Sequence, residues 1–172
     1  MTGVQTCALP IFIVTDANIL IFLSRLDLIE SFVVMDFEIH TTDFIIDEYY
    51  RGAKKEHNLK NLDKYIRSGK ITIHEYGYDD ILVIYEQKKS LSPSDCSIFK
   101  LSLDLEAILI TGDKPLKIFS ERSQVDVHGI VWLIDEMLGH EIIDQVEYRE
   151  KLTVLKGLSQ RLPVEEIDRR LK

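Results

Sequence analysis

The sequence is poor in the residues that build disulfide frameworks, zinc sites and phosphate-binding loops. Only two of its 172 residues are cysteines, and the isolated Cys7 and Cys96 provide neither a disulfide framework nor a zinc-ligand spacing. The eight glycines and four prolines form no glycine-rich phosphate loop, and no nucleophilic-serine elbow is present. The scarcity of cysteine favours a reducing compartment, so we expect the protein in the cytoplasm.

Long apolar runs and closely spaced histidines are also missing. The longest apolar runs are short and interrupted by Asp or Glu, so we expect no membrane span. The five histidines include no close pair at helical spacing, which argues against a histidine metal site. No internal repeat, low-complexity segment or second domain is visible in the sequence.

The chain does contain enough apolar material for one packed core. Hydrophobic residues make up 45% of it and aromatic residues 9%. This composition fits a single folded domain of ordinary size and excludes a disordered chain. The net charge of −8 argues against broad, non-specific coating of nucleic acid.

The first eleven residues, MTGVQTCALPI, resemble the translation of a common sequencing-library primer read from a GTG start. We therefore interpret residues 1–11 as a non-native leader; an unusual natural leader is the alternative. A secretory signal fits less well, because no Lys or Arg precedes the apolar stretch. We expect one α/β domain over residues 12–155 and a C-terminal helical tail over residues 156–172.

Strand-like and helix-like patterns alternate along the rest of the chain. Short apolar segments predict strands, and apolar residues repeated every three or four positions predict helices. We expect strands at 12–15, 38–41, 70–74, 107–110 and 125–127. We expect helices at 18–29, 43–50, 59–68, 79–89, 93–105, 115–119, 129–138, 141–155 and 163–172. Such alternation predicts a mostly parallel sheet with helices on both faces.

Four acidic residues fall where such a sheet places its ligands, outside the carboxyl ends of the strands. Asp16 follows the first strand, and Asp113 follows the strand at 107–110. Asp95 lies near the start of a helix that Ser92 can cap, and Glu48 lies on the helix after the second strand. Gathered carboxylates repel one another unless a cation joins them, and Mg²⁺ and Mn²⁺ prefer oxygen ligands.

Each acid also has a purely structural interpretation. Asp16 can cap the first helix, and Asp113 can be a loop acid. Glu48 can be an exposed helix acid like its neighbour Asp47, and Asp95 can compensate the helix dipole. The chain has 29 Asp and Glu residues in total, so position at strand ends and helix starts is what distinguishes these four.

Four segments resemble the motifs of PIN-domain nucleases. They are VTDANIL at 14–20, TDFIIDE at 42–48, LSPSD at 91–95 and LITGDKPL at 109–116. The resemblance runs from Phe12 to Leu138 and implies an α/β/α sandwich with a parallel sheet of four or five strands. It implies a metal-dependent endoribonuclease in which Asp16, Glu48, Asp95 and Asp113 hold Mg²⁺ or Mn²⁺. Many small bacterial members resemble VapC-type toxins, which implies an RNA substrate, an antitoxin partner and a homodimer.

The resemblance also implies supporting residues and shows one departure. Asn18, Ser94 and Thr111 match positions that orient ligands or water in the family, although turn and cap chemistry explains them equally well. Many relatives carry another acid where this chain has Pro115. A reduced metal set, or one metal instead of two, is compatible with that departure.

Two competing functions and the role of one basic stretch remain open at this point. One is a catalytically silent PIN-like module that binds RNA or protein, which the departure at Pro115 slightly favours. Another is a phosphatase with an aspartyl nucleophile, although that enzyme is expected to have an acid at the position of Asn18. A basic stretch, RGAKKEH at 51–57, is either a contact for RNA phosphates or a partner, or an ordinary solvated loop.

Overall fold

The computed structural model describes residues 9–55, 59–158 and 162–172. Most of the expected leader and the end of the basic stretch, His57 included, therefore lie outside the described residues. The sheet order is β3-β2-β1-β4-β5, and the four pairings between neighbouring strands are all parallel. The strands are β1 (Ile11–Thr15), β2 (Phe37–Thr42), β3 (Ile71–His74), β4 (Ile108–Ile110) and β5 (Val127–His128).

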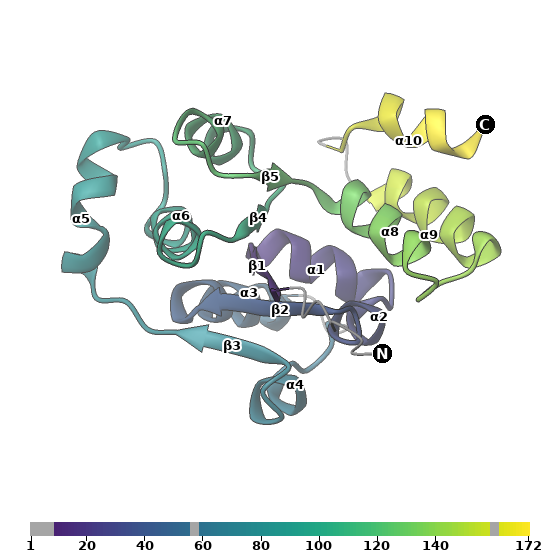
Figure 1. Ribbon diagram of the computed structural model, residues 1–172, viewed down its shortest axis with the longest axis horizontal. Coiled ribbons are helices and arrows are strands. Elements are labelled where there is room, and N and C mark those ends of the chain that lie inside the picture. The colour runs from purple at the N-terminus through teal and green to yellow at the C-terminus, as the bar shows by residue number, and fades with distance from the viewer. Residues whose placement is uncertain (1–8, 56–58, 159–161) are drawn as a thin grey trace, which may run out of the picture.

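Helices flank the sheet and complete the predicted α/β/α sandwich (Figure 1). The helices are α1 (Ala17–Arg25), α2 (Ile29–Val33), α3 (Asp43–Lys55), α4 (Asp63–Arg67), α5 (Tyr78–Gln87), α6 (Pro93–Leu105), α7 (Lys114–Arg122), α8 (Ile130–Gly139), α9 (Gln145–Leu158) and α10 (Val164–Leu171). In the described part of the chain, no helix is long and apolar enough to cross a membrane.

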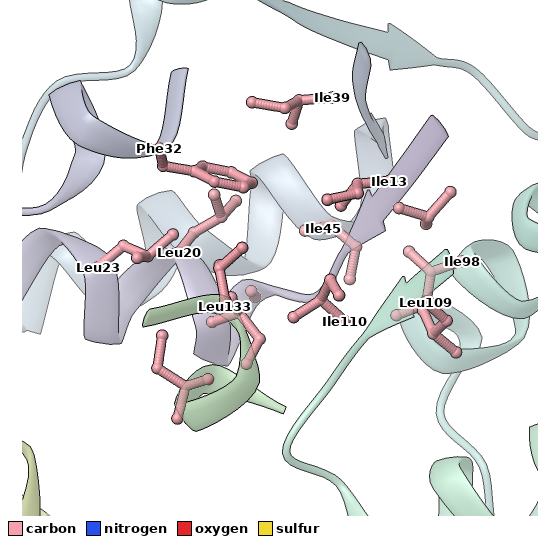
Figure 2. Packing of buried hydrophobic residues seen from close by; sticks show 14 of the residues in the cluster. Ile13, Leu20, Leu23, Phe32, Ile39, Ile45, Ile98, Leu109, Ile110 and Leu133 are labelled. Atoms are coloured by element: carbon pink, nitrogen blue, oxygen red, sulfur yellow. The ribbon is translucent and has the colours of Figure 1, made fainter. Parts of the chain in front are cut away.

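The central strand β1 and its neighbour β4 are buried on both faces. Successive residues of a strand point to opposite sides of the sheet. Ile13 and Val14 of β1 are nevertheless both inaccessible, as are Leu109 and Ile110 of β4. Figure 2 shows side chains from α1, α2, α3, α6 and α8 packed around these strands. The core therefore holds the carboxyl ends of β1 and β4 in place from both sides.

The helices α3 and α7 extend beyond their expected ends at 50 and 119. Three other expected helices are divided or shortened because local backbone conformations end or delay them. The helix expected over 18–29 divides into α1 and α2 at Asp27, which has a left-handed φ of 57°. Asp tolerates that conformation because its short polar side chain can bond locally. The helix expected at 59–68 shortens to α4, where the Asn61 side chain accepts the Asp63 N–H at 2.7 Å.

The helix expected from 141 begins four residues later, as α9. Glu141 takes a left-handed φ of 57° after α8, and the Asp144 carboxylate accepts the Glu147 N–H at 2.8 Å. The last short helix packs on its neighbours as α10. Its Ile167 is fully buried, and its Arg170 pairs with Asp135 of α8 at 2.6 Å.

Candidate active site at the sheet edge

The first acid lies at the carboxyl ends of β1 and β4. The Asp16 N–H donates to the Ile110 carbonyl at 3.1 Å, which continues the pairing between the two strands beyond Thr15. The side chain of Asp16 is buried, with 3% of the residue exposed. The hydroxyl of Thr111, the residue that follows β4, donates to Asp16 Oδ2 at 2.7 Å. Parallel pairing thus joins two residues that are 95 positions apart.

Asp16 both caps α1 and carries an unfavourable buried charge. Its Oδ1 accepts the Asn18 N–H at 3.4 Å, so the capping interpretation is correct as far as it goes. The pKa of Asp16 is raised to about 7, mainly by burial and also by the nearby charges of Asp95 and Glu48, while the hydrogen bond from Thr111 acts in the opposite direction. A simple helix cap exposed to water would show no such shift.

Asp95 lies in the first turn of α6, held by a reciprocal capping box. Asp95 Oδ2 accepts the Ser92 N–H at 2.8 Å, and the Asp95 N–H donates to Ser92 Oγ at 3.1 Å. Pro93 occupies the first turn, where no intrahelical donor is needed. Burial raises the pKa of Asp95, and the charges of Asp113 and Glu48 add to that rise. The Ser92 hydrogen bonds act in the opposite direction.

Asp113 caps α7 and is connected to Asp16 through one hydroxyl. Asp113 Oδ1 accepts the Leu116 N–H at 2.8 Å. The Asp113 N–H donates to Thr111 Oγ1 at 3.1 Å, and the same hydroxyl donates to Asp16. Thr111 therefore positions both the backbone of Asp113 and the carboxylate of Asp16. Pro115, at the position of the missing family acid, is exposed in the first turn of α7.

Glu48 reaches this group from α3, which follows β2 and packs against α6. It is partly buried, whereas the adjacent Asp47 is exposed. Its charge acts on both Asp16 and Asp95. Of the two adjacent acids on α3, Glu48 is the one coupled to the strand-end carboxylates.

The four predicted acids thus influence one another at one edge of the sheet. The couplings join Asp16 to Asp95 and Glu48, and Asp95 to Asp113 and Glu48. Among the described residues, no group of three or more His, Cys, Asp or Glu is already arranged to hold a metal ion. The carboxylates are close enough to repel, but their oxygens are not gathered as a finished set of ligands. A hard divalent cation fits this set of carboxylate oxygens, because its positive charge would balance the negative charge of the buried Asp16.

The three supporting residues differ in their surroundings. Thr111 is buried and contacts the site directly, as described above. Asn18 is exposed, and its backbone N–H is the group that meets Asp16. Ser94 is buried, and its carbonyl accepts the Ser97 hydroxyl, which also meets Thr42 Oγ1 at 2.7 Å. Only Thr111 makes a side-chain hydrogen bond to one of the four acids.

A second polar pair lies on the neighbouring strands and was missed by the sequence analysis. His40 Nδ1 of β2 lies 3.0 Å from His74 Nε2 of β3. Burial lowers the pKa of His40, and the charge of His74 lowers it further, against Glu38. Helical spacing gives no sign of this pair, because the two histidines lie on different strands. The relevant signal was that each histidine lies near the end of a strand, so pairing of those strands could bring them together.

The comparison with family models decides the classification. A model described as "DUF3368: PIN domain" matches residues 12–172. The chain belongs to the PIN-domain family. It therefore has a nuclease-type fold, since PIN domains are generally nucleases that act on nucleic acid and typically use divalent metals. No curated protein matches the sequence.

Proposed function

We propose that this PIN-domain protein is an endoribonuclease that depends on Mg²⁺ or Mn²⁺. Asp16, Glu48, Asp95 and Asp113 are proposed as its metal-holding catalytic residues. The observation that carries the proposal is the pKa of Asp16, raised to about 7 by burial and by Asp95 and Glu48. A folded protein that keeps a buried carboxylate beside other acids gains stability when a cation neutralises them.

The chain's own groups prepare this site. Backbone N–H groups of three helix starts hold one oxygen each of Asp16, Asp95 and Asp113. Thr111 orients the second oxygen of Asp16. Bound Mg²⁺ or Mn²⁺ would supply an activated water and stabilise charge on the scissile phosphate. Asn18 and Ser94 are proposed to orient ligands or water beside the acids.

The direct test is cleavage of structured and single-stranded RNA by the purified protein. We expect hydrolysis with Mg²⁺ or Mn²⁺ and none with EDTA. Asp16→Asn and Glu48→Gln should remove most activity, because each deletes one charged ligand and keeps the shape of the side chain. Asp47→Asn is the matched control on α3, since Asp47 is exposed. Undiminished cleavage in EDTA, or equal loss in the Asp47 variant, would contradict the metal mechanism.

One observation favours a second candidate, a catalytically silent module that binds RNA or protein. Pro115 replaces a family acid, and the described residues hold no finished group of metal ligands. Such a module would bind RNA equally well with and without metal and would cleave none. Calorimetric titration with Mn²⁺ separates the two, because the silent module should bind no stoichiometric metal ion.

A toxin role is the narrower form of the proposal. An antitoxin would insert an Arg or Lys among the four carboxylates and compete with metal. We also propose a homodimer formed through apolar helix faces, a non-native leader over 1–11, a nuclease domain over 12–155 and a helical tail over 156–172. The neighbouring genes test the toxin role: a short adjacent gene for a DNA-binding antitoxin supports it, and an isolated gene supports RNA processing.

A further inference from the structure

A groove of about 550 Å³ lies between the end of α5, the chain leading to α6, and one face of α7. Figure 1 shows the connection between α5 and α6 on the side of α7. Three cations line it, Lys88, Lys114 and Arg122, together with the apolar Ile118 and Phe119. We call this set the basic groove. No acidic residue is among its lining residues, although the whole chain carries a net charge of −8.

The three cations of the basic groove have no acidic partner within residues 9–55, 59–158 and 162–172. Several other cations of the molecule are paired, among them Lys60 with Asp27 and Lys100 with Asp104. Lys117 is paired as well, with Glu121 of the same helix α7 but outside the groove. An acidic protein that leaves three neighbouring cations unpaired in one concave surface has a surface suited to an anion.

Both walls of the basic groove connect along the chain to the candidate active site. Lys114 directly follows Asp113, and the wall that contains Lys88 leads through four residues to Ser92, which caps the helix of Asp95. Lys114, Ile118 and Arg122 recur at four-residue intervals and share one face of α7. Lys114 and Arg122 are therefore separated by about 12 Å along the helix, enough to follow a strand over more than one phosphate.

We propose that the basic groove binds the sugar–phosphate backbone of the RNA on one side of the cleaved bond. This inference rests on the proposed ribonuclease function and assigns its substrate a path. The four carboxylates repel a polyanion wherever metal does not neutralise them, so the RNA requires cations beside the site. The half-exposed Ile118 and the partly buried Phe119 offer apolar contact to sugars and bases between the phosphates.

An acidic protein segment is the competing occupant, because it carries the same charge as RNA. The position of the basic groove favours RNA: its two walls end at Asp95 and Asp113, where a phosphate must lie for hydrolysis. An acidic peptide bound there would place further carboxylates against the four acids. The groove is thus complementary to a chain whose anionic groups can also approach a metal ion.

The test is RNA binding by the full-length Asp16→Asn protein, which is not expected to cleave its ligand. The probe is a short fluorescent single-stranded RNA of mixed sequence, titrated at several salt concentrations. For single strands the logarithm of the affinity falls with log salt by about 0.7 per phosphate contact. Replacing Lys88, Lys114 and Arg122 with Gln should reduce that slope by about 2 and weaken binding for all sequences alike.

The control on the same helix is Lys117→Gln, which removes one positive charge from another face of α7. It should leave both the slope and the affinity close to those of the parent. Equal slopes in the triple variant and in the Lys117 control would overturn the proposal. Thermal melts of all variants check that they are folded, which we expect because the substituted side chains are exposed.

Photo-crosslinking with RNA that contains 4-thiouridine gives a second measurement. Crosslinks to residues 87–90 or 114–123 support the basic groove, and crosslinks confined to other surfaces contradict it.

Failure of the groove proposal can be distinguished from failure of the proposed nuclease function. Cleavage by the wild type with an unchanged triple variant refutes only the groove. RNA binding through the groove without any cleavage refutes only the nuclease. Capture of a polyglutamate peptide instead of RNA refutes the RNA path.

Discussion

Two pairs of buried or partly buried polar residues lie at or near the ends of neighbouring strands and differ in what burial does to them. Asp16 and Thr111 lie at the ends of β1 and β4, whereas His40 and His74 lie in β2 and β3. Burial raises the pKa of Asp16 and lowers the pKa of His40, so both side chains favour the neutral form. The acid is additionally surrounded by like charges, and the histidine is not surrounded by comparable cations beyond His74.

The two pairs differ in the partners that their polar groups find. The histidines offer each other a donor and an acceptor, through Nδ1 of His40 and Nε2 of His74. Asp16, Glu48, Asp95 and Asp113 include no base, so above its pKa of about 7 the buried charge of Asp16 finds no counter-charge among them. Similar positions in a parallel sheet therefore hold a hydrogen-bonded histidine pair in one place and a group of mutually repelling acids in the other.

The largest expected effect comes from removing the buried charge. The pKa of Asp16 is raised from 3.8 to about 7, so the folded state binds more protons between these values and its stability falls as pH rises through that window. Metal-free Asp16→Asn should be more stable than wild type at pH 8, by up to about 4 kcal/mol. Asn retains the cap of α1. The difference should nearly vanish below pH 4, as measured by urea denaturation.

The control for that prediction is Asp126→Asn, which removes an exposed acid that contacts His128 instead of the four carboxylates. It should show no comparable gain at pH 8. If metal-free Asp16→Asn is less stable than wild type at pH 8, burial of the Asp16 carboxylate does not reduce the stability of the folded protein.

Binding of a divalent metal ion should offset the repulsion among the four carboxylates and stabilise the wild-type protein. At about 100 times its dissociation constant, a divalent ion adds roughly 2.7 kcal/mol, or about 5–10 °C in melting temperature. Mn²⁺ should act at lower concentration than Mg²⁺. Na⁺ at matched ionic strength should do much less, because screening cannot bridge carboxylates. Asp113→Asn should reduce the rise. Equal small shifts with Na⁺ in both proteins would argue against a metal site.

The hydroxyl that connects two of the acids offers a smaller and more specific test. Thr111→Val removes the donor to Asp16 Oδ2 and the acceptor for the Asp113 N–H. We expect a loss of about 1–3 kcal/mol in stability and a 10–100-fold loss of Mn²⁺ affinity. Thr41→Val is the matched control, since its buried hydroxyl donates to the Thr15 carbonyl and meets no acid. It should reduce stability without changing metal affinity.

The smallest effect belongs to the histidine pair. The pKa of His40 is lowered, so the unfolded state binds more protons and stability falls as pH drops below about 6.5. Glu38 and His74 are the titratable groups that act on it. In His40→Gln, the melting temperature should fall less between pH 7.5 and 5.5 than in wild type. In Asp16→Asn it should fall more, because the opposing contribution of the acid is gone.

The sequence was sufficient for what depends on local order along the chain. Alternating strands and helices placed Asp16 and Asp113 at strand ends, and Ser92 with Pro93 correctly marked the start of α6. The parallel sheet followed from the same pattern, whereas the PIN fold followed from the four motifs that resemble the family; both are confirmed. These features need no knowledge of which strands are neighbours.

What depends on strand order or on distant segments could not be predicted. The bond between Thr111 and Asp16 requires β4 beside β1, and the histidine pair requires β3 beside β2. The basic groove joins Lys88 to residues of α7 that follow it after another helix and a strand. The break at Asp27 depends on a left-handed residue that Asp only occasionally adopts. Whether the four acids hold metal remains a prediction.

Three of the proposed site residues also cap the starts of helices, and this restricts how the proposed activity could be lost through mutation. Asp16 and Asp113 cap α1 and α7, and Asp95 completes the capping box of α6. Replacement of such a cap by Ala costs about 0.5–2 kcal/mol, whereas Asn or Ser can take over the same hydrogen bond. An inactive descendant would therefore reach a stable fold most readily through Asn or Ser at these positions. A lineage with apolar residues at these positions would need compensating changes elsewhere. The amino acids found at the three positions would therefore indicate whether a silent relative descends from an active nuclease.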